Sequence, residues 1–230
     1  MNKLFFSFMM AAVAFIPLQL LAQGKSSSLH PKTDKHGFYS IINCPTSLSF
    51  LKATSYQQEE GTYNVSIFRG RELAQSFSLE VTSGDLYYLD ANFDGNMDIL
   101  AGPATSRNYS TILLWDNRKG EFVPMEGDMY MLNGDFLVNP GKKFLVGACS
   151  GSYCSQYYTR YTWRGNRLVA DQTLIEITDP KAYREYGVRH RYTLIKGGDL
   201  EKIDANKKVV TNKKSQLPAE WRIILMEFGM

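Results

Sequence analysis

The sequence predicts an all-β domain of antiparallel strands, either a small β-propeller-like fold or a β-sandwich. Two observations favour this fold class. Short runs rich in Val, Ile, Thr, Tyr and Phe recur along the chain at about 8–12-residue spacing, separated by turns that contain Gly or Asn. Helical patterns are rare. The repeating unit fits about four or five propeller blades, and it fits two packed sheets equally well.

The first 22 residues have the layout of a secretory signal peptide. Lys3 gives a positive start, residues 4–21 are almost wholly apolar, and Ala22 is a small residue at a plausible cleavage point. A signal anchor is the competing interpretation, because the apolar run is almost long enough to span a bilayer. The first cysteine, Cys44, lies too far away for lipid attachment. We therefore expect an exported protein, periplasmic or secreted.

The rest of the chain divides into a leader and one domain. Residues 23–36 are polar and Ser-rich, which is typical of a flexible leader, and residues 37–230 are long enough for a single all-β domain. Without residues 1–22 the chain carries 25 basic and 23 acidic residues, a net charge of +2. This balance argues against a nucleic-acid partner, and the lysines near residues 207–214 are interpreted as a solvated hairpin.

Within the domain the strands are expected in pairs. The expected strand segments are residues 63–68, 73–77, 86–89, 99–100, 111–115, 122–123, 157–163, 168–169, 192–195 and 200–203. Residues 179–185 can form one or two helical turns, with Asp179 as the cap and Pro180 in the first turn. Residues 218–225 fit either a short helix or a last strand.

Three cysteines in an exported protein allow one disulfide and leave one thiol. Cys149 and Cys154 are close in sequence and are the favoured pair, which would close a tight loop. Cys44 can instead pair with either of them. Residues 147–151 have the G-x-C-x-G outline of a nucleophile elbow, but the β-like segment that follows does not fit its strand–turn–helix context. Because no other catalytic motif is present, we expect a protein that is not an enzyme.

An acidic loop lies between two strand-like segments and carries an oxygen-bearing side chain at every second position. These residues are Asp90, Asn92, Asp94, Asn96 and Asp98. Hard cations bind several such oxygens, and a bound Ca²⁺ would offset the repulsion between the carboxylates. The loop is not an EF-hand, because its twelfth position is Ala101 instead of Glu and its flanks are β-like. The sequence therefore predicts a structural calcium site, with a metal-free polar turn as the alternative.

This loop resembles the D-x-[DN]-x-D-G-x-x-D loops of FG-GAP and integrin-type repeats, which hold calcium between the strands of β-propellers. Residues 150–153 read S-G-S-Y and resemble the S-G-x-Y loop of periplasmic inhibitors of invertebrate-type lysozyme. The order of the two motifs is similar to that of exported bacterial immunity proteins with a calcium-bearing, propeller-like fold. The second inhibitor motif, Y-x-x-x-T-K-G, is not reproduced, because residues 192–197 lack the Thr before Lys.

These resemblances imply a binding protein that inserts a loop into the cleft of a peptidoglycan hydrolase. Ser150, Gly151 and Tyr153 would form the contact, since small residues permit close approach and Tyr supplies contact area. The alternatives are a carbohydrate-binding or adhesive module that uses tyrosines as stacking platforms, and a structural component of an envelope assembly. No membrane span is expected after residue 23.

Overall fold

The computed structural model describes residues 31–48, 52–81, 83–102, 110–127, 136–152, 154–178, 190–202 and 206–229. The predicted signal peptide, most of the predicted leader and the possible helical turns at residues 179–185 lie outside these ranges. The predicted fold class is confirmed: the described chain forms three antiparallel β-sheets and no closed barrel, which is a sandwich-like arrangement. No helix in this part of the chain is both long and apolar enough to cross a membrane.

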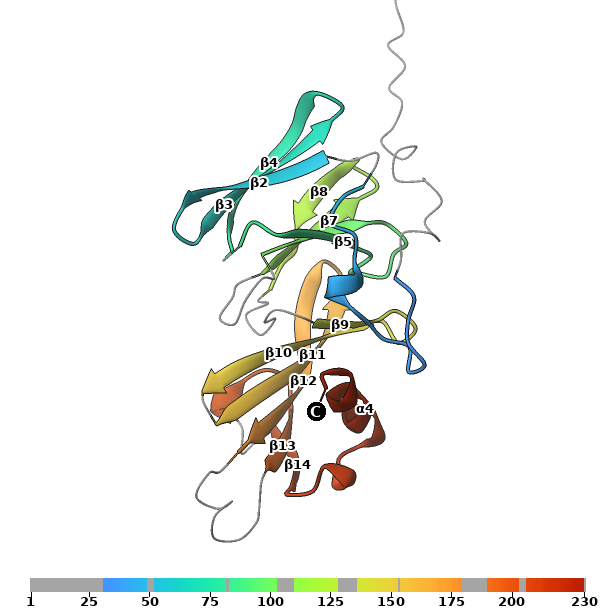
Figure 1. The fold of residues 1–230 in the computed structure, drawn as a ribbon, viewed down its shortest axis with the longest axis vertical. Helices are drawn as coiled ribbons and strands as arrows, with labels where there is room; N and C mark the ends of the chain where they lie inside the picture. Colours follow the sequence, from blue (N-terminus) through green and yellow to red (C-terminus); the bar gives the residue numbers. More distant parts are fainter. Residues whose placement is uncertain are drawn as a thin grey trace, which may run out of the picture.

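The three sheets and a C-terminal helix stack as successive layers (Figure 1). The three-stranded sheet has the order β2 (Lys52–Glu59), β3 (Thr62–Arg69), β4 (Glu72–Glu80). The four-stranded sheet has the order β5 (Leu86–Leu89), β6 (Asp98–Ala101), β7 (Thr111–Asp116), β8 (Glu121–Pro124). The seven-stranded sheet has the order β1 (Tyr39–Ser40), β9 (Phe136–Asn139), β10 (Phe144–Ser152), β11 (Ser155–Arg164), β12 (Arg167–Ile177), β13 (Arg191–Lys196), β14 (Lys207–Thr211). The helices are η2 (Ile41–Asn43), η3 (Leu200–Lys202), η4 (Lys214–Gln216) and α4 (Ala219–Glu227).

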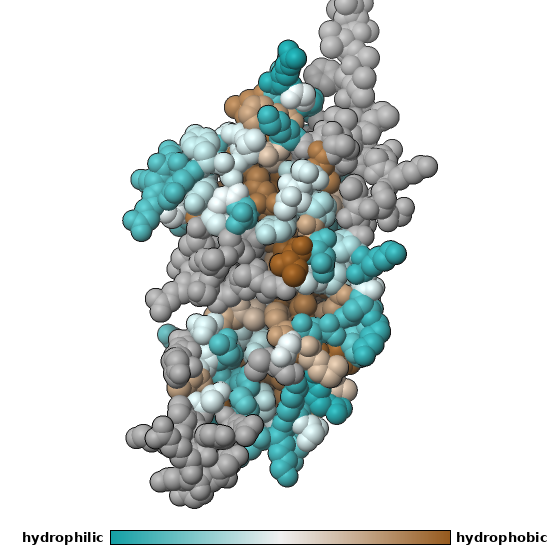
Figure 2. Space-filling view, viewed as in Figure 1, coloured by the Kyte–Doolittle hydropathy of each residue, from teal (hydrophilic) through white to brown (hydrophobic). Residues whose placement is uncertain are grey.

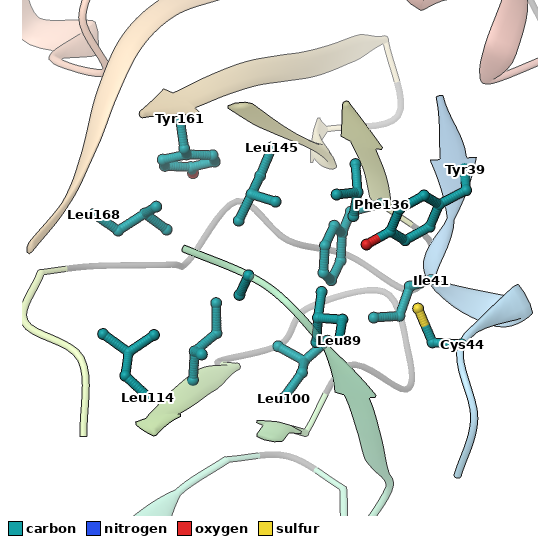
Figure 3. Close-up of a cluster of buried hydrophobic side chains, with 13 residues drawn as sticks. Tyr39, Ile41, Cys44, Leu89, Leu100, Leu114, Phe136, Leu145, Tyr161 and Leu168 are labelled. Atoms are coloured by element: carbon teal, nitrogen blue, oxygen red, sulfur yellow. The ribbon is translucent and has the colours of Figure 1, made fainter. Parts of the chain in front are cut away.

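The four-stranded sheet is the central layer because both of its faces are buried. Alternate residues of a strand point to opposite faces. Leu100 and Leu114 therefore pack toward the seven-stranded sheet, whereas Ile99 and Leu113 pack toward the three-stranded sheet. Figure 3 shows the first of these two cores, where side chains from both sheets meet. A strand that is apolar on both faces reads as a continuous apolar run, as residues 99–101 and 112–115 do.

Helix α4 covers the outer face of the seven-stranded sheet and decides the alternative left open for residues 218–225. Trp221, Ile224, Leu225 and Phe228 recur at the spacing of one helical face and pack into a third core. Pro218 precedes the first turn, where its missing N–H costs nothing. The chain therefore ends in a helix because this apolar stripe meets an apolar sheet face.

One predicted strand was wrong. Residues 200–202 form the short 3-10 helix η3, and the strand that pairs with β13 is β14, which begins at Lys207. β14 is the last strand of its sheet. Lysine on such an edge strand discourages pairing with another chain. The basic cluster thus lies partly on an edge strand.

The end of α4 also contacts the N-terminal segment. Asp34 closes a turn in which its Oδ1 accepts the backbone N–H groups of His36 (2.7 Å) and Phe38 (2.9 Å). Burial and a hydrogen bond with Asp34 raise the pKa of Glu227 to about 7, while nearby Lys35 opposes the rise. The two carboxyl groups can share a hydrogen bond only while one of them is protonated.

We expect this pair to make stability pH-dependent. The folded protein holds the Glu227 proton up to its pKa of about 7, whereas the ordinary value is 4.5. Across this window the folded state binds more protons than the unfolded state, so stability falls as the pH rises from 4.5 to 7. Urea unfolding at several pH values should show this decline, and Glu227→Gln should flatten it. An unchanged slope in the variant would contradict the assignment.

Candidate functional site

The acidic loop joins β5 to β6 in the central sheet, where Leu89 pairs with Asp98. Its flanks are strands, as the sequence predicted. Ala91 is fully buried, Phe93 packs against the core on one side of the sheet, and Met97 packs into the core on the other side. Because these apolar residues anchor the loop, the polar residues between them face outward. This anchoring explains the alternation in the sequence.

Asp98 differs from the other acidic residues because its side chain is fully buried. Its Oδ2 accepts the backbone N–H of Ala91 (2.9 Å), and its Oδ1 accepts the backbone N–H of Trp115 in β7 (2.9 Å). β6 and β7 pair from Ile99 and Leu113 onward. The carboxylate therefore extends the ladder by one bond and ties the loop to the neighbouring strand.

The remaining polar side chains bond within the loop. Asp90 accepts the backbone N–H groups of Asp94 and Gly95, both at 3.0 Å. Asp94 accepts the backbone N–H of Asn96 (2.8 Å), and Asn92 bonds Asp94 through its amide group (3.0 Å). Gly95 has a φ of 90°, a conformation that favours glycine. The bend at this glycine lets the Asp90 carboxylate accept the N–H groups of both Asp94 and Gly95.

The donor chemistry of the loop suits a hard cation. Oδ1 of Asp94 already accepts two N–H groups of Asn96, whereas its Oδ2 accepts one, from Asn92, and keeps a second lone pair. Burial raises the pKa of Asp98 well above its usual range, and the nearby charges of Asp94 and Asp90 also raise it. In the described part of the chain no basic side chain forms an ion pair with Asp94 or Asp98. Among the same residues no three His, Cys, Asp or Glu side chains converge into a ready-made metal site.

A polar groove of about 340 Å³ lies beside the acidic loop. Asn92 and Asp94 line one wall, the β7–β8 turn lines another, and Asn166 of the β11–β12 turn contributes to the rim. Trp163 of β11 donates its indole N–H to the carbonyl of Ala91 (2.7 Å). The loop is thus held against the seven-stranded sheet as well as within its own.

The predicted contact residues lie at the turn between β10 and β11. Ser150 pairs with Gln156 and Ser152 pairs with Ser155, so Gly151 is the extra residue of a β-bulge. The Ser150 side chain is exposed, and its Oγ accepts the amide N–H of Gln156 (3.1 Å). Tyr153 lies outside the described residues. The structure therefore brings Ser150 and Gly151 together at the end of a bulged hairpin.

The predicted disulfide was wrong. Cys44, Cys149 and Cys154 are all described, and no disulfide joins any two of them. Cys149 lies within β10, opposite Tyr157, whereas Cys154 lies in the turn beyond the bulge. Cys44 is buried in the core between the four- and seven-stranded sheets. Strand pairing holds the hairpin in place of the expected covalent bridge.

The two candidate sites lie at opposite ends of β11. The hairpin end is at Ser155, and the contact with the acidic loop is made by Trp163. Eight residues at about 3.3 Å each separate them by about 26 Å along the strand. A cation in the acidic loop would therefore stabilise the stacked sheets without touching the hairpin end.

A buried acidic residue next to the hairpin escaped the sequence analysis. Glu176 is 2% exposed and pairs with Gln156 on one side and Tyr192 on the other. Its Oε1 lies 2.8 Å from Nδ1 of His190, and its Oε2 accepts the hydroxyl of Tyr158 (3.4 Å). Burial, followed by the charge of Glu176, raises the pKa of Tyr192 to about 12. The only sign of this buried acidic residue in the sequence is a Glu at an inward-facing position of β12.

No family model matches the chain, and no curated protein matches it. Among solved structures, one described as a Xanthomonas type IV secretion system related protein is similar in fold. The identity is 15%, the TM-score is 0.47, and the match covers 78% of this chain and 96% of the other. A likeness of this degree carries no argument about function.

Proposed function

We propose that the protein is an exported, calcium-stabilised binding protein that inhibits a lysozyme-like peptidoglycan hydrolase. Ser150, Gly151 and Tyr153 would enter the cleft of the hydrolase, and the acidic loop would hold the ion. The observation that carries the proposal is the bulge at Gly151, which leaves Ser150 exposed beside a residue without a side chain. The resemblance of residues 150–153 to an inhibitor loop points in the same direction.

The chemistry near the hairpin supports binding over catalysis. The thiolate is the nucleophilic form of cysteine. Burial raises the pKa of Cys149, which disfavours that form. Nδ1 of His190 lies 2.8 Å from the buried carboxylate of Glu176, and the second oxygen of that carboxylate accepts the hydroxyl of Tyr158 on the neighbouring strand. These contacts stabilise the sheet on which the hairpin stands, and such rigidity lowers the entropy lost on binding.

Calcium is expected to raise the stability of the protein. A ligand that binds only the folded state at about a hundred times its Kd adds about 2.7 kcal/mol. The melting temperature should therefore rise when calcium replaces EDTA. Asp94→Ala should remove this rise with little effect in EDTA, because Asp94 is exposed. Equal melting temperatures of the wild type in calcium and EDTA would rule out the metal.

Inhibition should depend on the hairpin end. Truncating an anchor at the centre of an interface costs about 2 kcal/mol or more. We therefore expect Tyr153→Ala to weaken inhibition of a matched lysozyme-like hydrolase by about thirtyfold or more. The measurement is turbidity loss of a cell-wall suspension against inhibitor concentration, in calcium buffer.

Met226→Ala provides the matched control, because Met226 is half exposed on α4 and away from the hairpin. It should inhibit as the wild type does. If Tyr153→Ala and Ser150→Ala both inhibited as fully as the wild type, the hairpin end would not be the surface that contacts the hydrolase. Failure of the wild type to inhibit any of a panel of peptidoglycan hydrolases would remove the inhibitor function itself.

A further inference from the structure

The three-stranded sheet has an unusual distribution of charge. All its charged residues stand at strand ends, namely Lys52, Glu59, Arg69, Glu72 and Glu80. Charged side chains on edge strands, such as β2 and β4 here, commonly keep a sheet from pairing with other chains. In Figure 2 most of the surface around β2–β4, at the top of the view, is pale, and the strongly hydrophilic side chains gather toward its margins. The middle of this sheet is exposed but uncharged.

One face of the sheet is covered and the other is open. Val65 and Ile67 of β3 point into the core shared with the four-stranded sheet. The alternate residues point outward, so Asn64 and Ser66 lie on the open face with their cross-strand neighbours. Asn64 Oδ1 accepts the hydroxyls of Ser66 (3.0 Å) and Ser76 (2.8 Å). The open face therefore presents hydroxyl groups that are already held in position.

Aromatic rings flank these hydroxyl groups on the same face. Tyr56 lies opposite Asn64, and its side chain is 57% exposed. Phe68 of β3 pairs with Lys52 of β2 on one side and with Leu73 of β4 on the other. The Lys52 ammonium sits 5.8 Å from the centre of the Phe68 ring. An exposed tyrosine ring offers an apolar face with a polar tip.

A small cavity adjoins the open face at the β2 margin. It has a volume of about 230 Å³ and is lined by Thr46, residues 53–55 and residues 84–87. Thr54 belongs both to this lining and to the open face, where it lies opposite Ser66. Ser55 donates its hydroxyl to the carbonyl of Gly84, which fixes the two walls against each other. Thr54 is thus the residue that the cavity lining and the open face have in common.

We propose that this surface, defined by Thr54, Tyr56, Asn64, Ser66 and Ser76 with the adjoining cavity, binds a neutral oligosaccharide. Sugar rings combine an apolar C–H face, which packs on an aromatic ring, with hydroxyls that bond amide and hydroxyl side chains. The rows through Asn64 and Ser66 carry no charged side chain that would attract an anionic polymer, and the Lys52 ammonium lies in the next row, over the Phe68 ring. This inference concerns a different sheet from the hairpin and does not depend on the proposed inhibition.

The arrangement favours a glycan over a protein partner. Protein interfaces have an apolar, fully buried centre with a polar rim. Here the centre is polar instead, because the central row consists of Thr54, Ser66 and Ser76. Tyr56 and Leu73 stand in the flanking rows beside polar residues. A row of hydroxyl side chains with Tyr56 and Leu73 beside it suits a sugar chain, because each sugar ring also combines hydroxyl groups with an apolar C–H face.

The test is calorimetric titration of the full chain with chitohexaose and with cellohexaose, two neutral hexasaccharides. We expect saturable binding of at least one of them in the millimolar range or tighter. Tyr56→Ala should weaken it tenfold or more, and Ser76→Glu, which places a charge in the central row, should weaken it similarly. Met226→Ala, on α4, should bind as the wild type does. Unchanged melting temperatures would show that the variants fold, as expected for exposed positions.

Two results would overturn the inference. The first is no saturable binding of either hexasaccharide by the wild type, or equal binding by the wild type and Tyr56→Ala. The second is a concentration-dependent dimer in sedimentation that Tyr56→Ala abolishes, since the face would then serve self-association. Loss of hydrolase inhibition alone leaves the inference standing, because the hairpin variants do not touch this sheet.

Discussion

Asp98→Ala is expected to lower the free energy of unfolding by about 2–6 kcal/mol. The substitution leaves two buried backbone donors, the N–H groups of Ala91 and Trp115, without their acceptor. Each buried donor left unpaired costs about 1–3 kcal/mol. Chemical denaturation in EDTA measures this effect directly, because any contribution from calcium is then absent.

Asp94→Ala is the matched control for this prediction. Asp94 belongs to the same loop but is exposed, and its bonds remain within the loop. In EDTA it should cost little, while Asp98→Ala should be strongly destabilising in EDTA and calcium alike. If both variants lost stability only in calcium, Asp98 would be a calcium ligand, and its hydrogen bond to Trp115 of β7 would contribute little to stability. The pair of variants therefore separates a structural carboxylate from a metal-binding one.

Trp221→Ala is expected to cost about 3–5 kcal/mol, the usual range for a large aromatic residue in a core. Trp221 is 1% exposed in the core between α4 and the seven-stranded sheet. Its indole N–H also donates to the side chain of Gln172 in β12 (2.9 Å). Urea unfolding should show the loss, and hydrogen exchange should show earlier opening of α4 than of the central sheet.

Two further variants resolve this effect into its parts. Trp221→Phe keeps most of the packing and removes the bond to Gln172, so it should cost less than Trp221→Ala. Met226→Ala, on the exposed side of α4, should be nearly neutral. If Trp221→Ala proved as mild as Met226→Ala, the helix would contribute little to stability, and the third core would be dispensable.

Local features of the chain were predictable from the sequence. The alternation of residues 63–68 and the apolar run of residues 111–115 indicate strands, and both are strands. The acidic loop was expected between two strands, and it joins β5 to β6. These predictions succeed because strand periodicity and turn chemistry act over a few neighbouring residues. The choice between a helix and a strand for residues 218–225 stayed open, since it depended on the surface that α4 would meet.

Sequence proximity is a poor guide where contacts between distant residues decide the structure. Cys149 and Cys154 are close in sequence, yet strand pairing places Cys149 opposite Tyr157 in β11, whereas Cys154 lies in the turn. Similarly, the sequence grouped Asp98, which is buried, with four residues that are half-buried or exposed. Its distinct environment arises because Trp115, seventeen positions away, supplies a backbone donor.

The sequence by itself determined an antiparallel all-β chain with an oxygen-rich loop between two strands and a small-residue turn before an aromatic strand. Periodicity and turn composition are local properties, and they carry this information. Only the tertiary structure decided the stacking of the three sheets, the burial of Asp98 and Glu176, and the open face of β2–β4 with its uncharged middle. Each of these depends on which strand faces reach another layer and which stay in water, and burial is set by partners that lie far away in the sequence.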